Sequence, residues 1–322
     1  MERLKFDEIF QDDTKLGIKI QASEYLGSGK YPIIDQSHNA VAGYTNEQEG
    51  IFEDVPVIVF GDHTRVIKYV DNPFFLGADG IKILHSKLPN TNYKYLYYAL
   101  KNAHIPDTGY NRHFKWLREV EIKYPSAELQ ARIVSVLDGL STVLVQRKQQ
   151  LDYLDTLVKA RFVEMFGDTF RNLKNLPILS WNDVFNATTG KLDSNASTEA
   201  GKYPFFTCSK EVLRIDKYAF DQEALLLAGN NAAGKYDVKH YKGKFNAYQR
   251  TYVLSLKQNW SYELFKYQLE DKLDYLQQQS LGGLTKYLTM KILRELNFLI
   301  PDNNDQKEFT DFVHRVDKSK VI

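Results

Sequence analysis

Hydrophobic and polar positions near the start of the chain follow the pattern of a mixed α and β module. Two short runs rich in β-branched residues, bounded by glycine and aspartate, predict strands at 55–60 and 81–84. Asn92 stands before tyrosines and leucines at helical spacing, which predicts a capped helix over 93–102. Strict alternation at 120–124 predicts a half-exposed strand that stops at the following proline.

The same order of elements returns in the second half of the chain. Strands are predicted at 224–228, 251–254 and 296–300, and a helix at 262–270 is capped by Ser261. Short phrases also recur in the same order and at nearly constant separation: Phe6–Phe10 in kind at Trp181–Phe185, Gly29–Pro32 unchanged at Gly201–Pro204, Asn92-Tyr93 at Ser261-Tyr262, and Arg118-Glu119 at Arg294-Glu295. We therefore predict two copies of one module.

The clearest helical signal lies between the two modules, over 126–166. This run has no proline and one internal glycine, Ser126 can cap its start, and Gly167 follows as a stop. Its apolar residues recur at the four- and three-residue spacing of a coiled-coil seam, interrupted by Arg147: Ile133, Leu137, Leu140, Leu144, Leu151, Leu154 and Val158. At about 1.5 Å per residue the helix is roughly 60 Å long, which suits a spacer.

A similar helix begins after the second module. Asp302 follows Pro301 as its cap, and the positions that match the first seam are Phe309, Val313 and Val316. Because the sequence ends at Ile322, we expect this helix to be shorter than the first and to leave part of the seam within 133–165 uncovered. A homodimer through that seam is one arrangement that would cover it.

The predicted fold class is therefore α+β, with two repeated mixed α/β modules joined by a long coiled-coil helix. The expected divisions are a first module at 1–125, the long helix at 126–168, a second module at 169–301, and the start of a second, truncated helix at 302–322. The length of 322 residues agrees with two domains that each have a core of their own.

The composition indicates the cellular compartment in which the protein is expected. No stretch approaches the ~20 apolar residues that span a bilayer, and the first five residues lack the apolar core of a secretory signal. The single cysteine, Cys208, excludes an internal disulfide framework, and we expect it to be a packed residue and not a nucleophile. We expect a cytoplasmic protein.

The sequence carries no motif that predicts an enzyme. Asp71–Phe75 lacks the second proline of the motif with which adenine-methylating enzymes hold a base, and Gly27–Lys30 lacks the spacing and the Ser/Thr of a phosphate loop. The histidines show no metal-binding pair, and one cysteine cannot build a zinc cluster. We expect no catalytic residue, no metal and no cofactor.

The net charge of +1 means that contact with a polyanion would depend on local clusters. One candidate cluster lies between 235 and 250, where five cations face only Asp237: Lys235, Lys239, Lys242, Lys244 and Arg250. Phosphate binding and an ordinary solvated loop both fit this run.

Three phrases carry a resemblance to a known family. Pro125–Ile133 is similar to the start of its first conserved helix, Phe162–Asp168 resembles the end of that helix, and Gly-Lys-Tyr-Pro occurs early in each module. With two α/β modules, each followed by a long helix, the chain resembles over essentially its whole length the specificity subunit of type I restriction–modification systems. It departs from the family in the shorter second helix.

The resemblance implies that each module recognises one half of an asymmetric, bipartite sequence in double-stranded DNA. It also implies that the two long helices pair antiparallel and dock two methyltransferase subunits, which bind S-adenosylmethionine and methylate adenine N6. A separate motor-nuclease subunit cuts DNA, and the specificity subunit performs no chemistry. The alternative is a non-catalytic oligomeric scaffold built from duplicated modules and a coiled coil.

Candidate DNA contacts are donors on the predicted loops and in the basic cluster. They are Lys30, His63, Thr64, Arg65, Asn111, Arg112, His113, Lys202, Asn230, Asn231, Lys235, Lys239, Lys242, Lys244, Gln249, Arg250 and Lys286. For any one of them, a solvated side chain or an internal hydrogen bond is an equally good interpretation.

Overall fold

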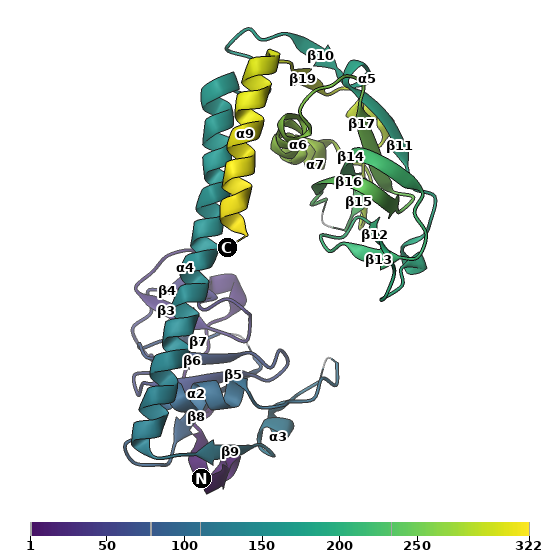
Figure 1. The fold of residues 1–322 in the computed structure, drawn as a ribbon. Coiled ribbons are helices and arrows are strands. Elements are labelled where there is room, and N and C mark those ends of the chain that lie inside the picture. Colours follow the sequence, from purple (N-terminus) through teal and green to yellow (C-terminus); the bar gives the residue numbers. More distant parts are fainter. Residues whose placement is uncertain (1, 78, 110, 233, 322) are drawn as a thin grey trace. The chain divides into compact units, whose positions relative to one another are not determined.

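The computed structural model describes residues 2–77, 79–109, 111–232 and 234–321. It divides into two compact units, Met1–Gln146 and Arg147–Ile322 (Figure 1). Each unit is a mixed α/β domain, as predicted, and the long helix α4 (Ala127–Phe166) contributes its first half to unit 1 and its second half to unit 2. Among the described residues, no helix combines the length and the apolar content needed to cross a bilayer.

Unit 1 contains a four-stranded sheet of order β2-β8-β5-β6 and a three-stranded sheet of order β4-β3-β7. The strands of the first sheet are β2 (Phe10–Asp12), β8 (Ile81–Ser86), β5 (Val57–Gly61) and β6 (Ile67–Val70). Those of the second are β4 (Gly43–Thr45), β3 (Tyr31–Ile34) and β7 (Phe75–Leu76), and β1 (Glu2–Lys5) pairs with β9 (Glu121–Tyr124). Helix α2 (Tyr93–Lys101) packs against β5 and β6, and the short helices are α1 (Phe6–Ile9) and α3 (Phe114–Leu117).

Unit 2 repeats this arrangement in one six-stranded sheet of order β11-β17-β14-β16-β12-β13. Its strands are β11 (Phe185–Thr189), β17 (Thr251–Leu256), β14 (Phe220–Ala228), β16 (Val238–Ala247), β12 (Tyr203–Phe206) and β13 (Leu213–Ile215). Two small ribbons pair β10 (Ile178–Ser180) with β19 (Asn297–Leu299) and β15 (Asn230–Asn231) with β18 (Lys286–Tyr287). The helices are α5 (Trp181–Val184), α6 (Tyr262–Asp271), α7 (Leu273–Gln279), α8 (Met290–Leu293) and α9 (Asn303–Lys320).

The main difference between the two sheets lies at a strand that is interrupted in unit 1 and continuous in unit 2. In unit 2 the end of β16 runs parallel to β12, so a single strand joins both parts of the sheet. In unit 1 the equivalent strand is split into β6 and β7, and Pro73 lies in the break. Because proline has no backbone N–H to donate to a sheet, it interrupts a strand at such a position.

The repeat extends to individual hydrogen bonds. Buried Gln130 donates to the carbonyl of Pro125 at 2.9 Å, and buried Gln306 donates to that of Pro301 at the same distance. Likewise, the backbone N–H of Ser86 donates to the Tyr93 hydroxyl in unit 1, and Leu256 donates to the Tyr262 hydroxyl in unit 2. The duplication predicted from the sequence is thus confirmed at the level of side-chain contacts.

Within unit 2, α9 runs antiparallel to the second half of α4. Arg147 donates to the Ser319 carbonyl at 3.1 Å near one end, Asp155 pairs with Lys320 at 2.8 Å, and Arg161 pairs with Glu308 further along. The rings of Phe162 and Phe309 pack edge to face, with centroids 5.6 Å apart. This stretch of the predicted seam therefore has an internal partner.

The rest of the predicted seam behaves differently from a uniform coiled coil. Ile133 packs against the core of unit 1. Leu140 and Leu144 are 56% and 71% exposed, whereas Leu151 and Leu154 are half-buried beside the α9 region. The seam is thus divided into a part covered by unit 1, an exposed part, and a part within unit 2.

Candidate nucleic-acid interface

The turn that carries the candidate DNA contacts His63, Thr64 and Arg65 is held by contacts within unit 1. The Thr64 hydroxyl donates to the Gln36 carbonyl at 2.6 Å, and the His63 backbone N–H donates to the Gln36 side chain at 3.2 Å. Arg65 has a φ of +60° and pairs with Asp107 at 2.7 Å. These contacts orient the turn, and a contact from Arg65 to DNA would have to compete with its carboxylate.

His113 is a structural residue. It is fully buried, its Nδ1 lies 3.0 Å from the Asp62 carbonyl, and its Nε2 lies 3.3 Å from the Thr108 hydroxyl. Since an imidazole without exposed surface cannot reach a base edge, His113 no longer counts as a base-contacting candidate. Its neighbours Asn111 and Arg112 are exposed.

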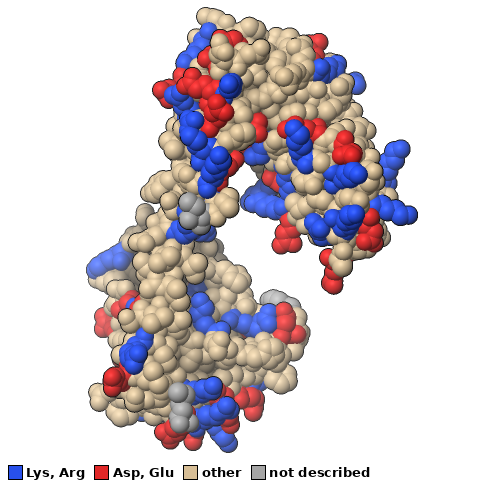
Figure 2. Space-filling view, viewed as in Figure 1, with Lys and Arg blue, Asp and Glu red and all other residues tan. Residues whose placement is uncertain are grey.

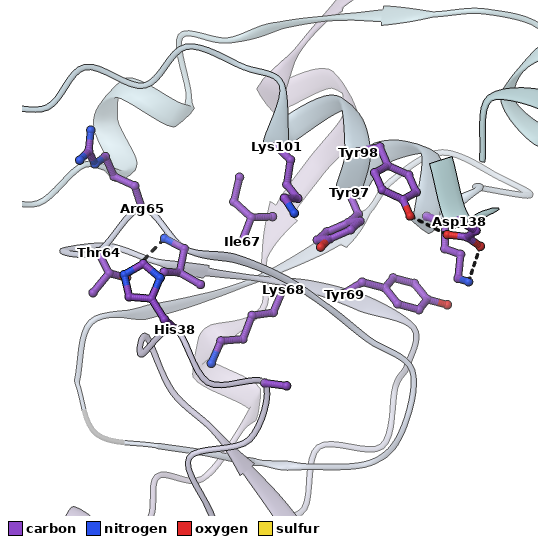
Figure 3. A pocket seen from close by; sticks show the side chains of 13 residues that line it. His38, Thr64, Arg65, Ile67, Lys68, Tyr69, Tyr97, Tyr98, Lys101 and Asp138 are labelled. Atoms are coloured by element: carbon purple, nitrogen blue, oxygen red, sulfur yellow. Dashed lines mark hydrogen bonds and ion pairs between the residues drawn. The ribbon is translucent and has the colours of Figure 1, made fainter. Parts of the chain in front are cut away.

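A hollow of about 670 Å³ in unit 1 contains cations and phenols that the sequence did not single out (Figure 3). Lys94 and the Tyr98 hydroxyl both contact the Asp138 carboxylate of α4, at 2.7 and 2.6 Å, and these contacts hold the pKa of Asp138 below its usual value. Lys101 lies over the Tyr97 ring at 5.3 Å. Lys94 and Lys101 are two helical turns apart on α2, which is the pattern that could have indicated a shared basic face.

Buried Lys68 lines the same hollow. Its ammonium is 3.6 Å from Asp35, and burial lowers its pKa. Because Asp138 and Asp35 already lie beside Lys94 and Lys68, Lys101 is the lining lysine that the described residues leave without an ion pair.

In unit 2 the predicted basic cluster is mostly strand and not loop. Lys239, Lys242 and Lys244 lie on β16. Lys242 stands opposite Glu223 of β14 and pairs with it at 3.0 Å. Lys244 pairs with Asp221 at 3.9 Å, and Lys239 pairs with Asp237. Three of the five cations of the cluster thus have a carboxylate partner, two of them on the neighbouring strand.

A separate group of candidates comes together around the β15–β18 ribbon. Asn230 and Asn231 pair with Tyr287 and Lys286, respectively. A hollow of about 400 Å³ beside the ribbon is lined by Asn230, Arg250, Thr285 and Tyr287. In the part of the chain that the structure describes, neither Arg250 nor Lys286 nor exposed Lys235 forms an ion pair, so these cations are available to a ligand.

The remaining candidates occupy other positions. Lys30 and Lys202 are both exposed and lie over the ring of the tyrosine that follows, at 4.9 and 5.5 Å, so the repeated Gly-Lys-Tyr-Pro has the same geometry in both units. Exposed Gln249 donates to Asp193 at 3.4 Å. On the face drawn in Figure 2, acidic side chains lie among the basic ones on each unit.

The potential metal ligands and the single cysteine of the described residues bear on whether these donors belong to a reactive site. Within the described residues, no three His, Cys, Asp or Glu side chains are grouped as a metal site requires. Cys208 is half-buried, and its thiol is 3.5 Å from the Arg250 carbonyl, which makes it a packed residue.

Comparison with known proteins gives a consistent result. The model of the type I restriction modification DNA specificity domain matches residues 1–153 and 178–322. The chain is 37% identical over 127 residues to the type I restriction enzyme EcoDI specificity subunit of Escherichia coli. This alignment covers 38% of this chain and 27% of the relative. The chain is 28% identical over 173 residues to the EcoR124I/EcoR124II specificity subunit of the same species, covering 48% and 43%.

The matched part of the chain thus spans less than half the length of each of these two relatives. The crystal structure of the type I restriction-modification S subunit from M. genitalium is similar in fold, with a TM-score of 0.64 and 18% sequence identity. That match covers 99% of this chain and 90% of the other.

Proposed function

The chain belongs to the family of type I restriction–modification DNA specificity subunits, and we propose that each of its modules recognises one half of a bipartite, asymmetric DNA sequence. Members of this family are recognition subunits without catalysis of their own, so we assign no catalytic residue and no cofactor. We assign the two half-sites to the modules at 1–125 and 169–301.

The observation that carries the proposal is a shared framework with different loops. Gln130 and Gln306 make the same contact in the two units, yet the donors near the loops differ. In unit 1 Arg65 is paired with Asp107, whereas in unit 2 Arg250 has no ion pair with another described residue. Base edges are distinguished by the pattern of donors and acceptors that face them, so different loops on one framework suit two different half-sites.

A second part of the proposal concerns the exposed face of α4. Its residues Val136, Leu140, Val143 and Leu144 are 56–71% exposed and recur at helical spacing, so they form one apolar stripe. Apolar stripes of this kind mark protein interfaces. We assign this stripe, named the α4 stripe below, to docking of methyltransferase subunits, which would supply S-adenosylmethionine and methylate adenine N6 beside a motor-nuclease subunit.

The proposal is tested by co-expressing the chain with a partner adenine methyltransferase and mapping methylated adenines across the host genome. We expect a split motif of two short half-sites separated by a fixed gap. Exchanging residues 169–301 for the module of a relative should change one half-site and leave the other as it was. Unsplit methylation, or methylation that does not depend on the chain, would contradict the assignment.

Arg250 and Lys242 provide a matched pair within unit 2. Arg250→Ala is expected to weaken binding to target DNA about tenfold and to lower the slope of log K against log salt by about one, because one unpaired cation is lost. Lys242→Ala is expected to change the affinity less than twofold and to leave the slope unchanged, since Glu223 already offsets that charge. Both are measured by fluorescence anisotropy from 50 to 200 mM salt, the range over which phosphate contacts weaken markedly.

The opposite order of effects would show that the β16 lysines exchange their carboxylates for phosphates. In that case the basic cluster, and not the β15–β18 ribbon, would be the main phosphate contact of unit 2.

A further inference from the structure

The most exposed leucine of the described chain lies at the tip of a short loop in unit 2. Leu284 is 95% exposed, and its neighbours Leu281 and Tyr287 are 48% and 40% exposed. The loop connects α7 to α8 and contains β18. Burial of an exposed leucine against a ligand is favourable, and three exposed apolar side chains within seven residues are a concentrated group.

The base of the loop is firmly held. The backbone groups of Leu281 and Tyr287 exchange two hydrogen bonds, at 3.0 and 2.9 Å. Lys286 pairs with Asn231, and the backbone N–H of Leu288 donates to the Gly229 carbonyl at 2.8 Å. The loop therefore has strand pairing on two sides of its base.

The tip has a shape that only glycine permits. Gly282 has a φ of +102°, and a Cβ at this position would lie 2.3 Å from the Thr285 carbonyl oxygen. At the adjacent Gly283 a Cβ would meet nothing within 4 Å. The turn is thus tight at its first residue and open on its outer side, so Leu284 is presented to solvent.

Hydrogen-bond donors border the small apolar group that Leu284 forms with Leu281 and Tyr287. Arg250, Asn230 and Thr285 line the hollow beside the ribbon, and Lys286 follows two residues after Leu284. Three apolar side chains bordered by cations and amides are too small a patch for a stable protein interface. It fits DNA, where apolar side chains enter between bases while neighbouring donors bind phosphates and base edges.

Resting on the proposed function, we propose that Leu284 is a wedge that enters the half-site recognised by unit 2 and unstacks one base step. Arg250 and Lys286 hold the backbone on either side of that step. Wedge insertion makes recognition depend on how easily the step opens, which adds specificity at a position without a direct base contact.

The test uses the full chain in complex with its methyltransferase partner and duplexes that carry 2-aminopurine at successive positions of the methylation motif. We expect the fluorescence to rise at one step in the unit 2 half-site with the wild-type complex, and the rise to disappear with Leu284→Ala. The same variant should bind the target about tenfold more weakly, since the contacts made by the inserted side chain are lost, while Leu284→Phe keeps both signals.

Two controls separate this role from general effects. Leu173→Ala removes another leucine, 72% exposed, from the segment between α4 and β10, and should change neither signal. Binding of Leu284→Ala to a scrambled duplex, and its salt dependence, should stay within twofold of wild type because no charge is removed.

The wedge is overturned if the wild-type complex distinguishes target from scrambled DNA but no 2-aminopurine position responds, or if Leu284→Ala binds the target as tightly as wild type. Weaker binding without loss of a fluorescence signal also overturns it, and indicates contact with a base edge or methyl group instead. If the wild-type complex does not distinguish target from scrambled DNA, the proposed function fails together with the wedge.

Discussion

Replacing Leu140 and Leu144 together by glutamate is expected to prevent assembly with the methyltransferase, and so to abolish adenine methylation, while leaving the chain folded. Both side chains are exposed on the α4 stripe, so the substitutions should not disturb either core. At a helix interface, each lost leucine removes about 2 kcal/mol of burial, and each unpaired buried carboxylate adds several kcal/mol of cost. The sum, about 8–10 kcal/mol, corresponds to binding weakened by on the order of 10⁶-fold or more.

The measurement is co-purification with the methyltransferase subunit, followed by sedimentation of the complex and by circular dichroism of the free chain. Val145→Glu is the matched control, because Val145 is 58% exposed on the same helix but lies opposite Val136 around its axis. We expect Val145→Glu to leave the complex intact. Equal loss with both variants would show that the α4 stripe is not the docking face.

The same variants distinguish two possible partners of the α4 stripe, which are a second copy of the chain and the methyltransferase subunit. If the free wild-type chain sediments as a dimer and Leu140→Glu with Leu144→Glu converts it to a monomer, a second copy covers the stripe before the methyltransferase arrives. A wild-type chain that stays monomeric across the micromolar range leaves the methyltransferase as the occupant that we propose.

Much of the fold could be predicted because its signals are local. Asn92, Ser261 and Asp302 each cap the helix that was expected to follow, accepting backbone N–H groups from the first turn. Gly167, with a φ of +81°, ends the long helix as anticipated. Caps and glycine stops depend on a few adjacent residues, so one sequence suffices to find them.

The sequence alone could not predict which charged side chains form ion pairs, because the partners depend on strand register. Lys242 and Lys244 form ion pairs with Glu223 and Asp221, which stand opposite them only because β14 pairs with β16 in one register. Burial of His113 depends on a long-range contact of another kind, since its partner carbonyl belongs to Asp62, which follows β5 and is far away in sequence. A charge cluster in a sequence therefore predicts a surface only after its strand partners are known.

The seam on α4 shows what heptad spacing alone cannot predict. Its heptad spacing is real, but the spacing alone does not say which part is covered by which element. Ile133 is covered by the core of unit 1, Phe162 by Phe309 of α9, and Leu140 by no described residue to a comparable degree. The periodicity predicted a helix with an apolar face, but only the tertiary structure shows which element packs against each part of that face.

Lys272, at the junction of α6 and α7, presents a buried charge whose removal should stabilise unit 2. Its side chain is 2% exposed, its ammonium donates to the Thr169 carbonyl at 3.3 Å, and it lies over the Phe170 ring at 4.4 Å. Burial lowers the pKa of Lys272 to about 8, against the weaker opposing effect of Asp271. In the unfolded chain the pKa is about 10.4.

This difference fixes the sign of the pH dependence. Between pH 8 and about 10.4 the unfolded state binds more protons than the folded state, so the contribution of Lys272 to stability rises with pH across that window. Below pH 8 the lysine is charged in both states, and the full cost, on the order of 3 kcal/mol, is present. Above the window it is neutral in both states, and the cost is absent.

Lys272→Met is therefore expected to raise the free energy of unfolding at pH 7 by about 2–3 kcal/mol, with a gain that shrinks towards zero as the pH passes 10. Urea unfolding of unit 2 at several pH values, recorded for wild type and variant, measures the gain as a difference, so ionisation of the tyrosines cancels. Lys291→Met, at an exposed position on α8, should give no pH-dependent gain. A gain for Lys272→Met that stays constant from pH 7 to pH 10 would mean that apolar packing, and not removal of the buried charge, stabilises the variant.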